Sequence, residues 1–503
     1  MQKHLSLLAD VRGCMTRFDP LTPQIVAAQS EDGLTYEELQ TVLAVCGMDI
    51  RKVVFDGTRS FQNAFYADFE QGYYCWIPFC RTNLRDIVSK MDQNFRSPGF
   101  GQARSNHEWE TFYMMEVPLP MQIWDFERRY QMIEPEKVFS VWSSIHTHLD
   151  YANGMWKQEV LEYVFAHAPK TELPEPDEHG QITIYRGMGK RSQSAEAALS
   201  WTTDPVCALW FANRSARGTR LVSAKVAPEQ ILAYNAGHRG EHEVILKPGV
   251  IPEYTELDMI PSTEDHVPKL LAPVTEDFFR YGRIALSLGY PTEKLFQHHG
   301  VKHILRVLLL TMLYCQYSGD DLTEEDKQIL IYFSLLHDIG RDSEDEDDAH
   351  GDKSVDLIRS KNLRIKGIQL SKKGYRIAKL LIRHHCRDDK TGLERIRKVP
   401  NFTAKDADRA ARLYAIAKDM DGLDRVRFNG LDFRYLRTDY ARRLPLVAGG
   451  LLEEPLLDCV KAFTAGEGGS HEDLEYPCQL GGCRYGRDSG SHTGKGDRDR
   501  QDG

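Results

Sequence analysis

The chain has 503 residues, of which 41% are hydrophobic and 27% are charged, and its formal net charge at pH 7 is −10. This length exceeds what one ordinary hydrophobic core organises, so we expect several domains with the composition of a soluble globular protein. The acidic balance argues against nucleic acid as a partner, although a local basic patch stays possible.

The sequence has no membrane or export signal that we recognise. No run of 18 or more residues is apolar throughout, so we expect no membrane contact. The apolar stretch at residues 5–9 is too short for a secretory signal. The ten cysteines form no CxxC pair, which favours reduced thiols. We therefore expect a cytoplasmic protein, or one delivered into a host cell by a route that leaves no readable signal.

Four segments follow one another along the chain. Residues 1–130 are aromatic-rich and contain no chemical motif, so their role is unknown. Residues 135–255 and 278–445 are predicted to be two folded modules. Residues 466–503 consist mainly of glycine, serine and charged residues, and we expect them to be disordered. Linkers rich in proline and acid are predicted at 171–180 and 251–274.

Hydrophobic periodicity indicates the fold class of both modules. Apolar residues recur at helical spacing from 134 to 168, which predicts a pair of helices. Short β-like runs follow at 182–185, 220–226, 231–234 and 243–246. Helical patterning then dominates to about residue 465. The predicted fold class is α+β and multidomain, with an all-α module at the end.

The middle module contains three motifs suited to handling NAD. The guanidinium of Arg186, at a strand end, can donate two hydrogen bonds to a phosphate. Ser200 and Thr202 alternate along a strand, which places both hydroxyls on one face. Glu241 and Glu243 have the same spacing, so both carboxylates can reach one sugar. A carboxylate stabilises the oxocarbenium character that develops when the bond to nicotinamide breaks.

Each motif alone also fits a structural arginine, a helix cap or a solvated strand face. In this order the three motifs resemble the arginine–serine–glutamate class of mono-ADP-ribosyltransferases. The resemblance covers residues 135–255 and implies a helical lobe followed by a mixed β fold. It implies that Arg186 binds the NAD phosphate and that Ser200 and Thr202 line the NAD cleft. Trp201 interrupts the hydroxyl triplet of that family.

The same resemblance assigns roles to the two glutamates. It implies that Glu243 is the catalytic residue that binds the nicotinamide ribose. Glu241 would engage the acceptor, which we expect to be a protein. NAD is then the substrate that supplies the ADP-ribose.

Histidines and aspartates recur in the C-terminal module at spacings typical of a metal centre. A single histidine in such helices is usually a cap or a core residue. An ordered set from separate helices instead suits a divalent metal that activates water. The set consists of His303, His337, Asp338, His350, His385 and Asp421.

This pattern resembles the HD superfamily of phosphohydrolases over residues 278–445. The resemblance implies that the metal ligands are His303, His337, Asp338 and Asp421. It implies that His350 and His385 hold a second metal or bind phosphate. Asp419 and Asp424 remain competitors for the role of the closing aspartate.

The segment 337–347 also looks like the phosphodiesterase domain of SidE-type effectors, which works without a metal. By that resemblance the catalytic residues are His303, Glu344 and His385. The domain order is reversed relative to those proteins, and the full set of HD ligands argues for a metal. The acidic run that contains Glu344 also fits a solvated loop.

Three hypotheses follow. In the first, the middle module transfers ADP-ribose and the HD module cleaves a phosphodiester or pyrophosphate, for which the same adduct is one candidate. In the second, the HD module is a nucleotide phosphohydrolase and the middle module a degenerate sensor. In the third, residues 1–130 are a partner-binding platform. A minor alternative is a zinc site in the tail formed by Cys478, Cys483, His471 and His492.

Overall fold

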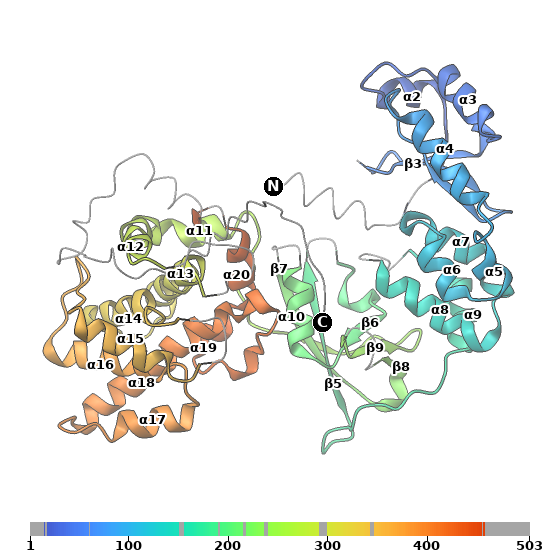
Figure 1. Ribbon diagram of the computed structural model, residues 1–503. Helices are drawn as coiled ribbons and strands as arrows, with labels where there is room; N and C mark the ends of the chain where they lie inside the picture. The colour runs from blue at the N-terminus through green and yellow to red at the C-terminus, as the bar shows by residue number, and fades with distance from the viewer. Residues whose placement is uncertain are drawn as a thin grey trace, which may run out of the picture. The chain divides into compact units, whose positions relative to one another are not determined.

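The computed structural model describes residues 15, 18–59, 61–149, 155–189, 192–214, 218–235, 240–290, 299–342, 347–454 and 456–457. The chain divides into two compact units (Figure 1). Unit 1 comprises residues 1–212 and 220–257, and unit 2 comprises residues 213–219 and 258–503. Unit 1 mixes helices and sheets, whereas the described residues from 258 onward form helices alone. The predicted mixed fold with an all-helical C-terminal part is therefore confirmed.

Unit 1 begins with an antiparallel sheet in the order β1-β2-β3-β4. Helix α3 starts at a capping box, in which Thr35 and Glu38 each accept the other's backbone N–H. Its buried Leu39 and Leu43 share a core with strands β2 to β4. The elements are β1 (Asp19–Pro20), α2 (Pro23–Gln29), α3 (Tyr36–Val45), η1 (Ile50–Lys52), β2 (Val53–Phe55), β3 (Ala64–Asp68), β4 (Tyr73–Trp76) and α4 (Leu84–Phe95).

A helical region follows, and aromatic residues fill its core. Tyr113, Phe126 and Trp142 are fully buried there and contact the partner helices. The predicted helix pair is present as α8 and α9. The elements are α5 (Gln102–Ser105), α6 (Trp109–Met115), η2 (Leu119–Met121), α7 (Gln122–Arg129), η3 (Tyr130–Met132), α8 (Pro135–His148) and α9 (Gln158–Ala166).

A second sheet has the order β10-β7-β5-β6-β9-β8. Tyr185 pairs with Thr202, and Thr202 pairs with Glu243, so the three motifs that were predicted to handle NAD lie on or beside neighbouring strands. A Cβ on Gly187 would lie 1.8 Å from the carbonyl of Ala208, so only glycine lets α10 lie against β5. The elements are β5 (Ile182–Gly189), η4 (Ala195–Ala197), β6 (Ser200–Thr202), α10 (Pro205–Asn213), β7 (Gly218–Val226), η5 (Pro228–Gln230), β8 (Ile231–Asn235), β9 (Glu243–Leu246) and β10 (Tyr254–Glu256).

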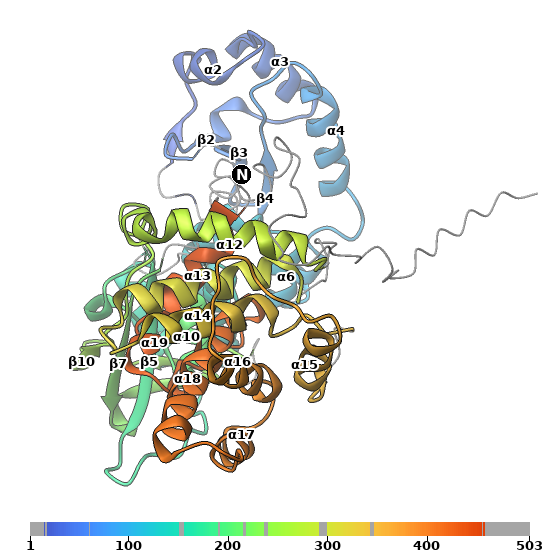
Figure 2. The same cartoon turned by 90° about the vertical axis from the view of Figure 1, so that its left-hand side faces the viewer.

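Unit 2 is a bundle in which α14 packs against α13, α16 and α18, and α15 packs against α16 (Figure 2). Capping boxes at Thr323 and Thr403 start α14 and α18. The elements are α11 (Val267–Leu271), η6 (Ala272–Val274), α12 (Thr275–Ser287), α13 (Val301–Tyr317), α14 (Glu324–Leu336), α15 (His350–Ser360), α16 (Lys372–His384), α17 (Asp389–Arg397), α18 (Ala404–Leu423), η7 (Asp424–Phe428), η8 (Phe433–Tyr435), α19 (Asp439–Arg442), α20 (Pro445–Gly450) and η9 (Leu451–Glu453).

The predicted β-like runs are all strands, which confirms that interpretation of the sequence. The predicted linker at 251–274 is only partly a linker, because it contains β10, α11 and η6. Strand β10 forms there because its backbone pairs with β7. Among the described residues, no helix has the length and apolar character that crossing a membrane requires. The predicted disordered tail and zinc site lie outside the described residues.

Candidate metal centre and a second polar site

The structure brings all six predicted metal ligands together, and each lies at or near a helix end. Their helices pack against one another through buried apolar side chains, and the polar groups meet at the helix ends. All are nearly buried except Asp421, whose side chain is 29% exposed. The residues are His303 in the first turn of α13, His337 and Asp338 after α14, His350 at the start of α15, His385 after α16 and Asp421 in the last turn of α18.

His303 and His337 form the first pair of facing imidazoles. Their Nε2 atoms lie 3.1 Å apart. The Nδ1 of His303 donates to Asp424 Oδ2 at 2.7 Å, and the Nδ1 of His337 donates to the carbonyl of Ser334 at 3.2 Å. Because both hydrogens occupy Nδ1, both Nε2 lone pairs point at each other. Two lone pairs at this distance repel unless a cation or a proton lies between them.

Two carboxylates complete the surroundings of this first pair. Asp421 Oδ1 lies 3.4 Å from Nε2 of His303 and 3.8 Å from Nε2 of His337. Asp338 Oδ2 lies 3.6 Å and 3.7 Å from the same two nitrogens. Two imidazole nitrogens and two carboxylate oxygens are a ligand set that divalent transition metals accept. The residues therefore fit a metal ion.

His350 and His385 repeat this arrangement. Their Nε2 atoms lie 2.9 Å apart. The Nδ1 of His385 donates to the carbonyl of Ile382 at 2.7 Å, and the Nδ1 of His350 donates to the carbonyl of Asp347. Arg341 Nη1 is a more distant neighbour of the same Nδ1, at 3.1 Å. The shorter carbonyl contact places the hydrogen on Nδ1, so this pair also presents two lone pairs to one point.

Asp338 joins the two pairs. Its Oδ1 lies 3.3 Å from Nε2 of His350 and 3.4 Å from Nε2 of His385, whereas Oδ2 faces the first pair. Within the described residues Oδ1 is buried and has no hydrogen-bond donor in good geometry. An ionised oxygen in that state is costly unless a cation compensates it. Asp338 could therefore offer one oxygen to a cation at each imidazole pair.

Electrostatics leave these groups ready to bind a cation. Burial lowers the pKa of His337 to about 4, so its ring is neutral at pH 7. Burial raises the pKa of Asp338, but the neighbouring His337 and the hydrogen bond from His299 outweigh it and hold that pKa well below its usual range. Burial also lowers the pKa of His303, but Asp421 and Asp424 outweigh it and raise the pKa. A cation would displace the proton held at His303.

The structure distinguishes the three candidate closing aspartates. Asp424 lies on the far side of His303, where it accepts from His303 and from Arg306, so it orients a ligand. Asp419 is fully buried and accepts from the backbone of Arg437 and the backbone and hydroxyl of Thr438, so it anchors the chain after α18. Asp421 alone among the three faces the imidazole pair.

Two glycines let the helix ends meet. A Cβ on Gly340 would lie 2.3 Å from the nitrogen of Ser354 in α15. A Cβ on Gly351 would lie 2.6 Å from the carbonyl of Ile382 in α16. The second histidine pair can therefore form only where both contacts are free of side chains. Glu344, the predicted third catalytic residue of the metal-free hypothesis, lies outside the described residues.

In unit 1, Arg186 belongs to β5, which pairs with β6. It donates to the carbonyl of Ser200 at 2.6 Å and to that of Gln193 at 3.4 Å. Its Nε is buried without an acceptor among the described residues. Burial lowers the pKa of Arg186 to about 10. A largely buried guanidinium held by carbonyls retains an attraction for an anion such as a phosphate.

A directed chain of hydrogen bonds leads to Glu243. Trp156 Nε1 donates to His146 Nδ1 at 3.1 Å, so the ring carries its hydrogen on Nε2, which lies 3.1 Å from Ser200 Oγ. Ser200 in turn hydrogen-bonds Glu243. Burial raises the pKa of Glu243 to about 7, against the effect of Ser200 and with a smaller contribution from Glu241. In the described residues Glu243 Oε2 has no donor.

One prediction for this site needs correction. The predicted shared strand face of Glu241 and Glu243 is wrong, because β9 begins at Glu243 and His242 between them has a φ of +48°. The left-handed residue turns the chain there. Thr202 donates its hydroxyl to the carbonyl of Glu241 at 2.7 Å and accepts from the nitrogen of Asp204 at 3.0 Å. Its hydroxyl therefore holds a turn.

Sequence reasoning missed His146, Arg306 and the orienting role of Asp424. His146 follows Trp142 by four residues and stacks on it, with ring centroids 4.8 Å apart. The sequence does show that this histidine lies on the apolar face of its helix. It does not show which strand that face packs against. Burial lowers the pKa of His146 to about 4, which keeps it neutral.

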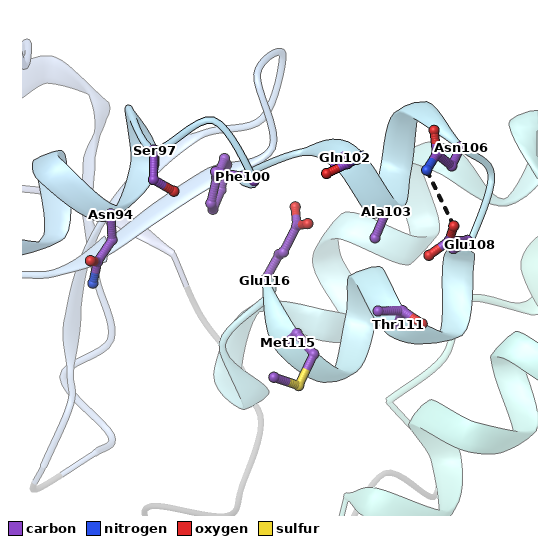
Figure 3. A pocket seen from close by; sticks show the side chains of 11 residues that line it. Asn94, Ser97, Phe100, Gln102, Ala103, Asn106, Glu108, Thr111, Met115 and Glu116 are labelled. Atoms are coloured by element: carbon purple, nitrogen blue, oxygen red, sulfur yellow. Dashed lines mark hydrogen bonds between the residues drawn. The ribbon is translucent and has the colours of Figure 1, made fainter.

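A separate hollow lies between the end of α4 and helices α5 and α6 (Figure 3). Phe100, Met115 and Glu116 are among the side chains that line it. Glu116 accepts from the backbone of Gly101 at 3.0 Å. None of the predicted site residues lines this hollow, and we assign it no function.

Comparison with known proteins identifies one family. Residues 300–426 match the family model of the HD domain, from the start of α13 to η7. This match confirms the predicted resemblance of this part of the chain to the HD superfamily. HD domains bind divalent metals. No curated protein and no solved structure matches the chain. The resemblances to ADP-ribosyltransferases and to SidE-type effectors remain predictions.

Proposed function

We propose that the HD region hydrolyses a phosphodiester or pyrophosphate at a centre of two divalent metal ions. One observation supports this above the others. Two imidazole pairs, each with facing Nε2 atoms, lie on opposite oxygens of the buried Asp338. Divalent cations bound there would activate a water molecule and stabilise the charge that develops on phosphoryl oxygens.

The side chains around the centre have distinct tasks in this proposal. Asp338 would offer one carboxylate oxygen to each metal ion, and Asp424 fixes the tautomer and orientation of His303. His299 lies at the partly exposed edge of the cluster, 3.2 Å from Asp338 Oδ2 through its Nδ1. Arg341 lies beside His350. The guanidinium of Arg341 can donate to the phosphoryl oxygens of a substrate at that edge.

The test compares Asp338→Asn with Asp356→Asn, an exposed aspartate of α15. We expect the wild type and the control to bind two metal ions per chain by elemental mass spectrometry and to hydrolyse bis(p-nitrophenyl) phosphate. Asp338→Asn should bind fewer ions and lose hydrolysis. If chelated wild type keeps its activity, the metal-free hypothesis with Glu344 is favoured instead.

A second proposed activity is ADP-ribosyl transfer in unit 1. It is favoured by the convergence of Arg186, Ser200 and Glu243 on neighbouring strands and by the free Oε2 of Glu243. In this reaction the bond between ribose C1′ and nicotinamide breaks and nicotinamide leaves. The acceptor then bonds to C1′ and loses its proton, for which Glu241 is the proposed base.

The test incubates a cell lysate with NAD and the purified protein, followed by mass spectrometry of the peptides. We expect wild type to produce an NAD-dependent adduct and Glu243→Gln to produce none. If Asp338→Ala leaves full ADP-ribose where wild type leaves phosphoribose, the two modules act in sequence. If Glu243→Gln changes nothing, the degenerate-sensor alternative is favoured, with the HD module as a nucleotide phosphohydrolase.

A further inference from the structure

Basic residues are concentrated beside the metal centre, in a chain that is acidic as a whole. Residues 359–398 contain fourteen lysines and arginines but three aspartates and glutamates. The whole chain has 64 lysines and arginines against 74 aspartates and glutamates. The net charge of −10 therefore conceals a strongly positive segment formed by the end of α15, helix α16 and helix α17 (Figure 2).

Helix α16 presents part of this charge as a stripe. Lys372, Arg376, Lys379 and Arg383 have the spacing i, i+4, i+7 and i+11, so they lie on one side of the helix. We call these four residues the basic stripe. Lys372 and Arg376 are exposed, and Lys379 and Arg383 are half-buried. Eleven residues of helix span about 17 Å. His385, a proposed metal ligand, follows the end of the same helix.

Other positive residues come close to the stripe. Burial, followed by the charges of Arg359 and Arg364, lowers the pKa of Lys379, so three cations from α15, the following loop and α16 are neighbours. Ion pairs in the described residues engage Lys373, Arg383, Arg387 and Lys398 with carboxylates. Lys372, Arg376 and Lys379 of the stripe form no ion pair with a described residue, so their charges are left to attract an anion.

The start of α16 shows that this charge opposes helix stability. The first turn of a helix favours acidic residues, because the backbone N–H groups there carry partial positive charge. Helices α12, α14 and α18 follow this preference with acidic first turns. Helix α16 has no acid in its first turn and begins with Lys372 and Lys373. Lys373 already pairs with Asp406, and a polyanionic ligand would give Lys372 a favourable partner.

We propose that the basic stripe, with Arg359 and Arg364 beside it, binds the phosphate backbone of a single nucleic-acid strand and leads it to the metal centre. This inference rests on the proposed hydrolysis of phosphodiesters, because such a strand supplies both the charges and the cleavable bond. The buried ligands favour a thin, flexible strand over a rigid duplex. The acidic remainder of the chain confines binding to this surface.

An acidic membrane surface is the competing ligand. Stable membrane binding needs apolar residues to insert beside the charges. Within residues 359–398 the structure exposes no large hydrophobic side chain. The nucleic-acid strand is therefore the better match, and acidic vesicles form one arm of the test.

The experiment measures fluorescence anisotropy of labelled 20-nucleotide single strands, one of RNA and one of DNA, over a salt series. The stripe variant is Arg359→Ala, Lys372→Ala and Lys379→Ala, none of which is a proposed metal ligand. The matched control removes three exposed basic residues of α11 and α12, Lys269, Arg280 and Arg283.

We expect wild type and control to bind a strand with an affinity that falls with salt. The stripe variant should bind roughly tenfold more weakly or worse, with a salt slope smaller by about 2, since each lost phosphate contact removes about 0.7. Which strand binds more tightly identifies RNA or DNA as the ligand.

Several outcomes would overturn the strand site: no binding at low salt, equal weakening in both triple variants, or binding to phosphatidylserine vesicles but to neither strand. If wild type hydrolyses bis(p-nitrophenyl) phosphate but binds no strand, only the strand site is wrong. If the expected binding pattern appears in a protein without hydrolysis, the strand site stands and the proposed hydrolysis is wrong.

Discussion

Asp424 illustrates how a buried carboxylate can serve a metal centre without binding the metal. Burial raises its pKa, but the charge of Arg306 and the hydrogen bond from His303 outweigh this and lower it to about 2. The ionised carboxylate then holds the Nδ1 hydrogen of His303, which leaves Nε2 as the ligand atom. Such orienting partners fix ring geometry and raise the basicity of the ligand.

We predict that Asp424→Asn weakens metal binding by about 10- to 100-fold, because the amide is a poorer acceptor for His303 and leaves Arg306 without a full counter-charge. Calorimetric titration of the metal-free protein with Mn²⁺ measures this. Asp432→Asn is the control, since Asp432 pairs with Arg434 instead. Equal affinities in both variants would contradict the orienting role.

Glu243 gives a prediction for the pH dependence of stability. Its pKa is raised from 4.5 to about 7, so between these values the folded chain keeps a proton that the unfolded chain releases. The free energy of unfolding therefore falls as pH rises through this window, by up to about 3 kcal/mol. In Glu243→Gln this loss should disappear.

Thermal unfolding of unit 1 at pH 5 and pH 8 checks this. Relative to wild type, Glu243→Gln should lose less stability between the two pH values. Glu256→Gln, an exposed glutamate of β10, should behave like wild type. If the melting temperatures of all three proteins rise by the same amount between pH 5 and pH 8, Glu243 is ionised in the folded state.

At the scale of elements, close helix contacts decide whether the second histidine pair forms. We predict that Gly340→Ala destabilises unit 2 by about 1–3 kcal/mol or more, because its Cβ would meet the backbone of Lys353 and Ser354, which cannot yield. The displaced α15 would move His350, so bound metal should fall below two ions per chain.

Gly422→Ala is the matched comparison, because no atom lies within 4 Å of an added Cβ in the last turns of α18. A helical alanine there should stabilise by about 0.5–1 kcal/mol. Denaturant unfolding and elemental mass spectrometry measure both variants. Similar effects of the two substitutions would show that the tight contact at Gly340 is absent in solution.

Much of the element pattern could be predicted from sequence, because helices and strands bury apolar residues at periods that the sequence displays. Strand β9 and helix α8 are examples. The linker at 251–274 could not be predicted fully, since β10 depends on a partner strand distant in sequence. The turn at His242 was equally hidden, because a positive φ at a histidine has no sequence signature.

The candidate metal ligands could be identified from sequence, since the order of histidines and aspartates is itself the signal. The hydrogen-bond partners of each ring could not, because Ser334, Asp347 and Ile382 contribute only backbone carbonyls. Every residue has a backbone carbonyl, so the residue type does not reveal which carbonyl accepts from a histidine ring. The chain from Trp156 to Glu243 was hidden for another reason, as it joins a helix to a strand that lies far along the sequence.

At the scale of the molecule, the two units should respond differently to metal. A ligand that binds only the folded state stabilises it, by about 2.7 kcal/mol at a hundredfold excess over Kd. Since the proposed ligands all belong to unit 2, we predict that chelation lowers one calorimetric transition and leaves a second, from unit 1, in place. Asp338→Asn should make the first transition insensitive to chelator. Equal shifts of both transitions would contradict the assignment.

The close approaches at Gly340 and Gly351 bear on how relatives of this chain should be recognised. A residue at either position with any side chain would push one helix end away from the next. A sequence that keeps all six ligand residues but has lost one of these glycines would therefore lack the close helix contacts that a two-metal centre needs. In an alignment of distant sequences, these two glycines should be weighted as heavily as the histidines.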